Sequence, residues 1–181
     1  SVALSGNTAL VGALFANPAG TSDAGAAYVF VRNGTLWTQQ AKLTAGDKAA
    51  DDYFGVSVAL SGETALVGAG WANPGGTVDA GAAYVFVRSG TTWSEEGILT
   101  AGDKAAEDVF GNSVALSGNT AVVGAYNASP GGAAGAGAAY VFTRSGTSWT
   151  QSTKLTADDK AADDEFGWTV ALNAEGTVVV G

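Results

Sequence analysis

The 181-residue chain is 46% hydrophobic and 14% charged, carries a formal net charge of −9, and contains no histidine, cysteine or methionine. It is therefore too hydrophobic for a disordered chain, and His- or Cys-dependent catalysis, disulfides and zinc sites built on His or Cys are excluded. Only eight Lys and Arg residues are present, and no apolar stretch is long enough for a transmembrane helix, so neither a nucleic-acid partner nor membrane insertion is expected.

The chain repeats itself at intervals of 56 residues without an insertion from Ser1 to Thr169. The interval separates the Trp residues at 37, 93 and 149, and it also separates three Phe-Gly pairs: Phe54-Gly55, Phe110-Gly111 and Phe166-Gly167. Such a period is the signature of a repeat architecture. It predicts three units, residues 1–56, 57–112 and 113–168, followed by the first hairpin of a fourth unit at 169–181.

Each unit is predicted to contain four short strands. In the second unit the expected strands are Ser57–Ser61, Thr64–Ala69, Ala82–Arg88 and Thr92–Thr100, joined by short Gly-containing turns and, between the second and third, by a longer Gly- and Pro-bearing loop. The connection to the next unit, 101–109, is rich in Ala and acidic residues and is expected to form one helical turn.

The strand faces predict how the units pack. The first three strands are apolar or small on both faces, so both faces need cover from other protein. In the fourth strand, Trp93 and Leu99 are expected to share a face with Glu95 and Gly97, while Ser94 and Glu96 point outward as on an edge strand. Four-stranded antiparallel sheets stacked face to face satisfy this pattern. The fold class predicted is thus all-β, with about three propeller-type blades plus an extra hairpin.

The residues that carry the period resemble the FG-GAP repeat, in its bacterial and archaeal form. The resemblance rests on the Phe-Gly pair, on Ser-Val-Ala-Leu-Ser-Gly followed by Thr-Ala-Leu-Val-Gly-Ala, and on Gly-Ala-Ala-Tyr-Val-Phe-x-Arg. It implies a β-propeller like that of integrin α-subunit heads, with adhesive or ligand-binding roles at the cell surface or outside the cell. Integrin-type repeats also carry an acidic calcium loop between the second and third strands. Here that loop offers only Asn17, Asp23, Asn73, Asp79, Ser129 and Gly135, too few carboxylates for calcium.

The strongest acidic pattern lies in the connections between units. The recurring groups are Asp47, Asp51 and Asp52; Asp103, Glu107 and Asp108; and Asp159, Asp163 and Asp164, each with a Lys inside it. Their oxygens suit a hard cation such as Ca²⁺. The alternative is that the first Asp caps a helical turn and the others keep the rim soluble. The cofactor prediction is accordingly none, or Ca²⁺ at these residues.

Two further residue sets are candidates for contacts. An aromatic residue stands just after the second strand in each unit, at Phe15, Trp71 and Tyr126. Because loops on a rigid scaffold often carry recognition, these three are predicted to form a partner surface, with a hydrophobic plug under the loop as the alternative. Arg32, Arg88 and Arg144 end the third strands, where pairing with neighbouring Asp or Glu is expected.

The predicted function is a non-catalytic structural or adhesive scaffold, extracellular or on the cell surface. Its partners are expected to be proteins: further repeats of a longer chain, which we favour, or other copies stacked head to tail. Two alternatives stay open. One is a calcium-dependent ligand-binding module, and the other is a scaffold attached to an enzyme domain outside these residues.

Overall fold

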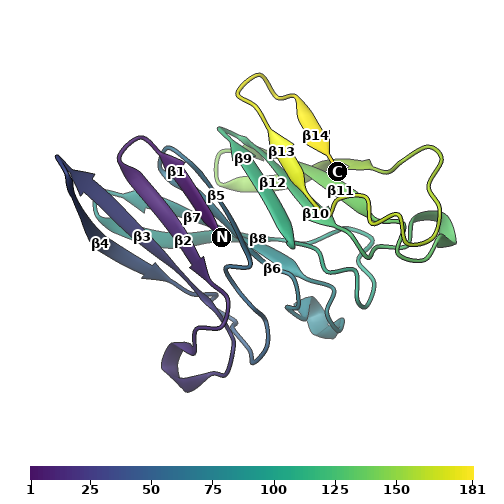
Figure 1. The fold of residues 1–181 in the computed structure, drawn as a ribbon, viewed down its shortest axis with the longest axis horizontal. Helices are drawn as coiled ribbons and strands as arrows, with labels where there is room; N and C mark the ends of the chain where they lie inside the picture. Colours follow the sequence, from purple (N-terminus) through teal and green to yellow (C-terminus); the bar gives the residue numbers. More distant parts are fainter.

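A computed structural model describes all residues from Ser1 to Gly181. It contains three four-stranded antiparallel sheets, in each of which the strands follow one another in chain order. Figure 1 shows the sheets side by side. We call each sheet a blade. Blade 1 holds β1 (Val2–Ser5), β2 (Thr8–Ala13), β3 (Ala26–Asn33) and β4 (Leu36–Leu43); blade 2 holds β5 (Ser57–Ser61), β6 (Thr64–Ala69), β7 (Ala82–Ser89) and β8 (Thr92–Leu99); blade 3 holds β9 (Ser113–Ser117), β10 (Thr120–Ala125), β11 (Ala138–Ser145) and β12 (Ser148–Leu155).

The strands begin and end where alternation and turn chemistry place them. In blade 2 the hairpin between β5 and β6 turns at Gly62 and Glu63, and the hairpin between β7 and β8 turns at Gly90 and Thr91. Both glycines have positive φ, which two-residue hairpins often require at the first turn position. The four predicted strands of this unit are therefore confirmed to within one residue at each end.

The apolar faces of the blades are buried between neighbouring blades, as predicted. One core lies between blades 1 and 2 and includes Leu10, Val29, Val67 and Tyr84. A second core lies between blades 2 and 3 and includes Leu66, Val85, Val123 and Tyr140. Successive first strands, β1, β5 and β9, pack closely against one another, whereas the outer strands β4, β8 and β12 meet only marginally. The blades thus fan out from their first strands, which is the arrangement of a propeller sector.

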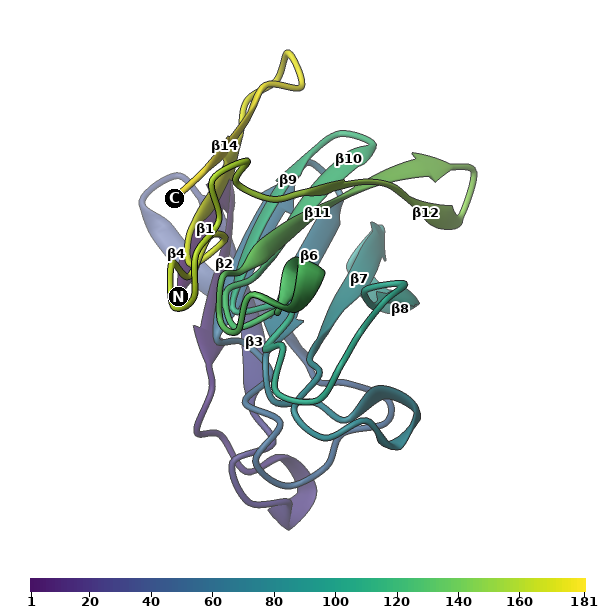
Figure 2. The same cartoon turned by 90° about the vertical axis from the view of Figure 1, so that its right-hand side faces the viewer.

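Beyond blade 3, β13 (Val170–Leu172) and β14 (Val178–Val180) form the predicted extra hairpin, drawn in yellow in Figure 2. It packs on β9 and β10 in the place that the first two strands of a next blade would take. The connections between blades contain turns but no helix, so the helical turn expected at 101–109 was a wrong prediction. The helical elements are the 3-10 turns η1 (Pro18–Gly20), η2 (Pro74–Gly76) and η3 (Pro130–Gly132). None of the helices is long and apolar enough to cross a membrane.

Candidate functional site

The Phe-Gly pair forms the joint between two blades. Phe110 is fully buried and packs edge-to-face on Tyr140 and Phe142 of blade 3, with ring centroids 5.5 and 6.0 Å apart. Its backbone N–H donates to Ala80 O of blade 2 at 3.0 Å. The ring therefore belongs to the core of one interface while its backbone is held by the preceding blade.

Gly111 brings backbone directly against backbone. Its N–H donates to Gly124 O of blade 3 at 2.9 Å, and its carbonyl oxygen accepts a hydrogen bond from Ser57 Oγ of blade 2 at 2.7 Å. Gly111 has a φ of +97°, and a Cβ on Gly68 would overlap its carbonyl oxygen. The close approach thus requires glycine at position 68, and the left-handed backbone favours glycine at position 111. Phe54-Gly55 repeats the joint one blade earlier, where Gly55 N–H donates to Gly68 O at 2.8 Å.

Side chains reinforce the first junction across its width. The Tyr84 hydroxyl of blade 2 donates to Asp47 Oδ1 at 2.9 Å, and Trp93 Nε1 donates to Gln40 Oε1 at 3.0 Å. Arg88 bonds Thr8 Oγ1 at 3.3 Å and pairs with Glu63 of its own blade.

The second junction uses equivalent positions. Tyr140 donates to Asp103 at 3.0 Å, and Trp149 donates to Glu96 at 3.2 Å. Arg144 pairs with the same Glu96 at 2.6 Å. Acid pairing is thus confirmed for Arg88 and Arg144, whereas Arg32 bonds the amide oxygen of Asn7 instead.

The fourth strand of blade 2 contains a β-bulge, and its side chains therefore point in other directions than predicted. Pairing between β7 and β8 shifts register between Val85 and Phe86, because Glu96 is an extra residue in β8. The alternation therefore reverses beyond it, and Trp93 packs toward blade 1 while Leu99 packs toward blade 3. The predictions that Trp93 and Leu99 share a face and that Glu96 points outward were both wrong. The Glu96 side chain is only 11% exposed, because the bulge turns it onto Arg144.

The acidic groups of the connections serve the turns and the junctions. Asp52 and Asp108 accept the backbone N–H groups of Ala49 and Ala105, at 2.5 and 2.7 Å. Asp51, Glu107 and Asp163 have left-handed φ and donate their N–H groups to the loop between the second and third strands. Asp164 accepts from Ala161 N–H at 2.6 Å and is exposed, whereas its equivalents Asp52 and Asp108 are buried. Asp159 is exposed, as are its equivalents Asp47 and Asp103.

Removal of divalent cations provides a direct test of the calcium prediction. No group of three or more acidic side chains is gathered to hold a metal ion, whereas calcium takes about six to eight oxygen ligands. We expect excess EDTA to leave the melting temperature unchanged, measured by circular dichroism at constant ionic strength. A melting temperature that falls with EDTA and returns with Ca²⁺ would contradict this expectation.

The loop residues that an integrin-type repeat would use for calcium close a turn here. Asn17 Oδ1 accepts the N–H of Asp23, and Asn73 Oδ1 accepts that of Asp79, both at 2.6 Å. In the third unit Ser129 Oγ accepts the N–H of Gly135 at 3.3 Å. All three donor residues have left-handed φ, which Asp and Gly tolerate better than most residues. This conformation explains why Gly replaces Asp in the third unit.

The predicted partner surface divides into two aromatic clusters. Tyr53 stands between Phe15 and Trp71, with ring centroids 5.7 and 5.2 Å away. Tyr126 lies one position earlier in its unit than Phe15 and Trp71 do in theirs, so the three positions are not equivalent, and it packs on Trp168 at 4.5 Å. Val109 takes the place of Tyr53 in the second unit, which interrupts the aromatic surface. Tyr53 gave no repeat signal, because its position changes from unit to unit.

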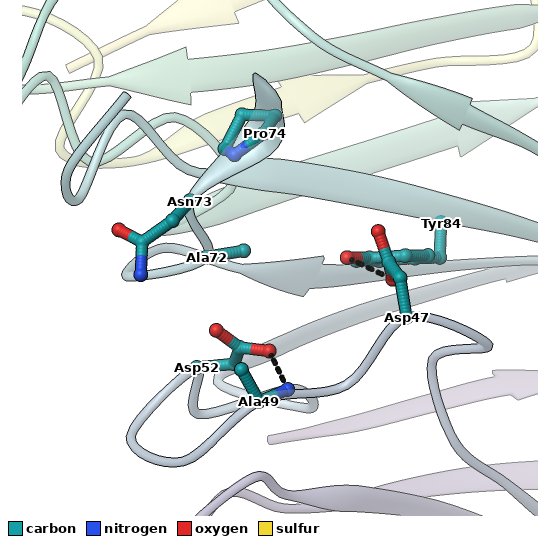
Figure 3. A pocket seen from close by; sticks show the side chains of 7 residues that line it. All are labelled: Asp47, Ala49, Asp52, Ala72, Asn73, Pro74 and Tyr84. Carbon is teal, nitrogen blue, oxygen red and sulfur yellow. Dashed lines mark hydrogen bonds between the residues drawn. The ribbon is translucent and has the colours of Figure 1, made fainter. Parts of the chain in front are cut away.

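A small cavity lies at each junction beside these contacts. The first has a volume of about 70 Å³ and is lined by Asp47, Asp52, Asn73 and Tyr84, together with Ala49, Ala72 and Pro74. Figure 3 shows the Tyr84–Asp47 and Ala49–Asp52 hydrogen bonds at its wall. Burial raises the pKa of Asp52. The hydrogen bond from the Ala49 N–H lowers this pKa, and the nearby carboxylates raise it further. Burial and the Asp47 carboxylate also raise the pKa of Tyr84, so its hydroxyl remains a hydrogen-bond donor.

Because the pKa values of Asp52 and Asp108 are raised, their amide variants are predicted to gain stability against urea to an extent that depends on pH. The folded state holds these protons more tightly than the unfolded chain, so this contribution to stability is complete below the unfolded pKa and is lost as the pH rises through the folded pKa. Asp52→Asn and Asp108→Asn should therefore raise the urea midpoint at pH 7. The gain should vanish below about pH 4, near the pKa of an unfolded Asp.

Asp103→Asn is the matched control with the opposite sign. Burial opposes ionisation of Asp103, but hydrogen bonds from Lys154 and Tyr140 outweigh it and hold its pKa low. This contribution is present above the unfolded pKa and is lost as the pH falls through the folded pKa. The variant should consequently be less stable than the parent at pH 7 and approach it in acid. Equal pH profiles for the two kinds of variant would contradict both assignments.

Comparison with known families identifies the repeat. The family model described as FG-GAP repeat matches residues 1–30, 37–86, 93–142 and 149–181. Each internal match begins in the fourth strand of one blade and ends in the third strand of the next, so the unit that the family model describes is the junction, with Phe-Gly inside it. No curated protein matches the chain.

Proposed function

Because this chain belongs to the FG-GAP repeat family, we propose that it acts as a non-catalytic structural or adhesive scaffold of stacked blades, outside the cell or at its surface. The support comes from where its polar groups are used. The recurring Tyr, Trp, Arg and Asp side chains bond across blade junctions, which assigns them to holding the stack together.

One observation carries the proposal: an uncovered face on blade 1 that matches a covered face on blade 2. Val2 and Leu4 are 75% and 71% exposed, whereas Val58 and Leu60, at the equivalent positions, are 8% and 9% exposed. Val58 and Leu60 belong to the core shared with blade 1, whereas no blade of the structure covers Val2 and Leu4. The face of blade 1 is thus built for burial by another blade.

The occupant that fits this face is a further FG-GAP repeat. Blade 1 presents Tyr28, Trp37 and Arg32 at the positions whose equivalents in blade 2 bond the preceding blade. A preceding repeat would supply the equivalents of Asp47, Gln40 and Thr8. In blade 1 these three residues accept hydrogen bonds from the Tyr, Trp and Arg of blade 2. Stacked repeats can be extended in this way because each one contacts only its neighbours.

The scaffold proposal is tested by adding one repeat. A variant with a second copy of residues 1–56 ahead of Ser1 should melt at a higher temperature than the parent, since burying one large aliphatic side chain contributes about 1.5–3 kcal/mol. The control is the same extension with Leu4→Lys at the new interface, which should lose most of the gain. Equal melting temperatures for the parent and the extended chain would refute stacking on this face.

The location is tested separately in the source cells. Proteinase K added to intact cells should degrade the protein, detected with an antibody to residues 1–181, while a cytoplasmic marker survives. Protection of the protein until the cells are lysed would reject a surface or extracellular location and leave the stacking result intact.

A further inference from the structure

The junction cavity between blades 1 and 2 has a counterpart between blades 2 and 3 that differs in one charged residue. The second cavity is lined by Asp103, Asp108, Tyr140 and Lys154, among others. There the Lys154 ammonium donates to Asp103 Oδ2 at 2.6 Å, while Tyr140 donates to Asp103 Oδ1 at 3.0 Å. The second cavity therefore contains its own cation.

In the first cavity the same acceptors lack that cation. Asp47 accepts from Tyr84 through Oδ1, as Asp103 does from Tyr140, but its Oδ2 has no partner in the chain. The residue equivalent to Lys154 in blade 2 is Ile98, which is 43% exposed. No salt bridge forms at Asp47, since the three ion pairs of the protein lie elsewhere.

A second carboxylate oxygen in the first cavity is also unpartnered. Asp52 is only 3% exposed, and its Oδ2 accepts the Ala49 N–H. Its other oxygen makes no hydrogen bond within the chain, and Figure 3 shows it turned away from Ala49, on the side of Ala72 and Asn73 that line the cavity. The buried Asp52 carboxylate thus has one hydrogen bond and no cation beside it, and an opposite charge at its second oxygen would offset part of its desolvation cost.

From these observations we propose that the cavity between blades 1 and 2 binds a primary alkylammonium group. Its N–H donors would bond the unpartnered oxygens of Asp47 and Asp52, in the role that Lys154 performs within the chain at the next junction. An ammonium carries three donors and one positive charge, which suits two carboxylates in a small cavity. Calcium is a poorer fit, because it takes about six to eight oxygens. This site goes beyond the scaffold role and does not depend on it.

The test introduces the lysine of the second junction into the first and removes it from the second. n-Butylammonium chloride is titrated into the ¹⁵N-labelled chain, with sodium chloride at equal ionic strength as the reference. Saturable shifts are expected at the Ala49 and Tyr84 amides and not at Ala105 and Tyr140. Ile98→Lys should weaken this binding by about tenfold or more, the loss expected when a charged hydrogen bond is blocked, while Ile98→Leu should preserve it. Lys154→Ile should create matching shifts at Ala105 and Tyr140.

A second probe separates the two sources of such a group. Nα-acetyl-lysine N-methylamide, which represents a lysine side chain of a partner protein, should bind at least as tightly as n-butylammonium when the natural occupant is such a lysine. Binding of n-butylammonium alone would indicate a free amine; either result supports the site. Shifts that sodium chloride reproduces, shifts that only Ca²⁺ produces, or binding unaffected by Ile98→Lys in a variant with native circular dichroism would overturn it.

Discussion

Gly68→Ala should destabilise the protein by about 3 kcal/mol or more, near the upper end of what overpacking a core position costs. The added Cβ would overlap the carbonyl oxygen of Gly111, and it would also press on Ser57 Oγ, which bonds that oxygen. The nearer obstacle is backbone, and the Ser57 hydroxyl can move aside only by giving up its hydrogen bond to that backbone, so the chain at Gly111 must move away from blade 2. Urea unfolding with linear extrapolation measures the loss.

Gly97→Ala controls for the substitution itself. A Cβ at Gly97 meets no atom within 4 Å, and this glycine does not have positive φ. Its effect should lie within about 0.5 kcal/mol of zero, as for most surface substitutions. Similar losses for Gly97→Ala and Gly68→Ala would mean that the tight backbone contact does not hold the blades together.

Phe110→Ala should cost about 3–5 kcal/mol, the usual range for removing a buried phenylalanine ring. Phe110 is fully buried and packs on both Tyr140 and Phe142, so its removal leaves a cavity in the core between blades 2 and 3. The rigid joint on either side limits how far that cavity can collapse. The free energy of unfolding from urea titration measures the effect.

Phe15→Ala removes the same ring from the opposite environment. Phe15 is 68% exposed and touches Tyr53 edge-to-face at 5.7 Å. Its loss should cost less than about 1 kcal/mol, since one such aromatic contact is worth about that much. Phe110→Ala as mild as Phe15→Ala would show that the Phe of the repeat does not anchor the blade.

The strands and their stacking could be predicted because two simple signals agree. In Ser57–Ser61 the alternation of side chains marks the strand, and a glycine turn ends it within one residue of the observed bound. The apolar character of Tyr84 and Val85, on opposite faces of one strand, required cover on both sides, and blades 1 and 3 supply it. In this blade the alternation of side chains and the need to bury both sheet faces predict the same stacked strands.

The bulge at Glu96 could not be predicted, because one extra residue leaves no mark on the pattern. Its position is set by pairing with β7, and pairing registers are a property of two strands together. All side-chain directions beyond the bulge were therefore reversed in the prediction. Glu96 was predicted to point outward, so pairing of Arg144 with an acid could be predicted but Glu96 could not be identified as that acid.

The candidate sites were only partly foreseen, for a related reason. Recurrence singled out Asp47 and Asp52, but it could not show that one accepts a tyrosine hydroxyl and the other a backbone N–H. The cavity between them is formed by residues 37 positions apart, Asp47 and Tyr84. Ile98 and Lys154 are equivalent positions with different residues. The importance of this difference could be recognised only from the structure, which shows a cavity at each junction.

The joint built around Gly111 has a consequence for how such genes change. Its contacts lie within one unit or between that unit and the next, so a duplicated 56-codon segment would carry matching surfaces on both of its sides. Recombination between tandem copies can lengthen or shorten the protein in whole units while every joint keeps its partners. Variation in copy number is consequently tolerated at the same positions where a single added methyl group is not.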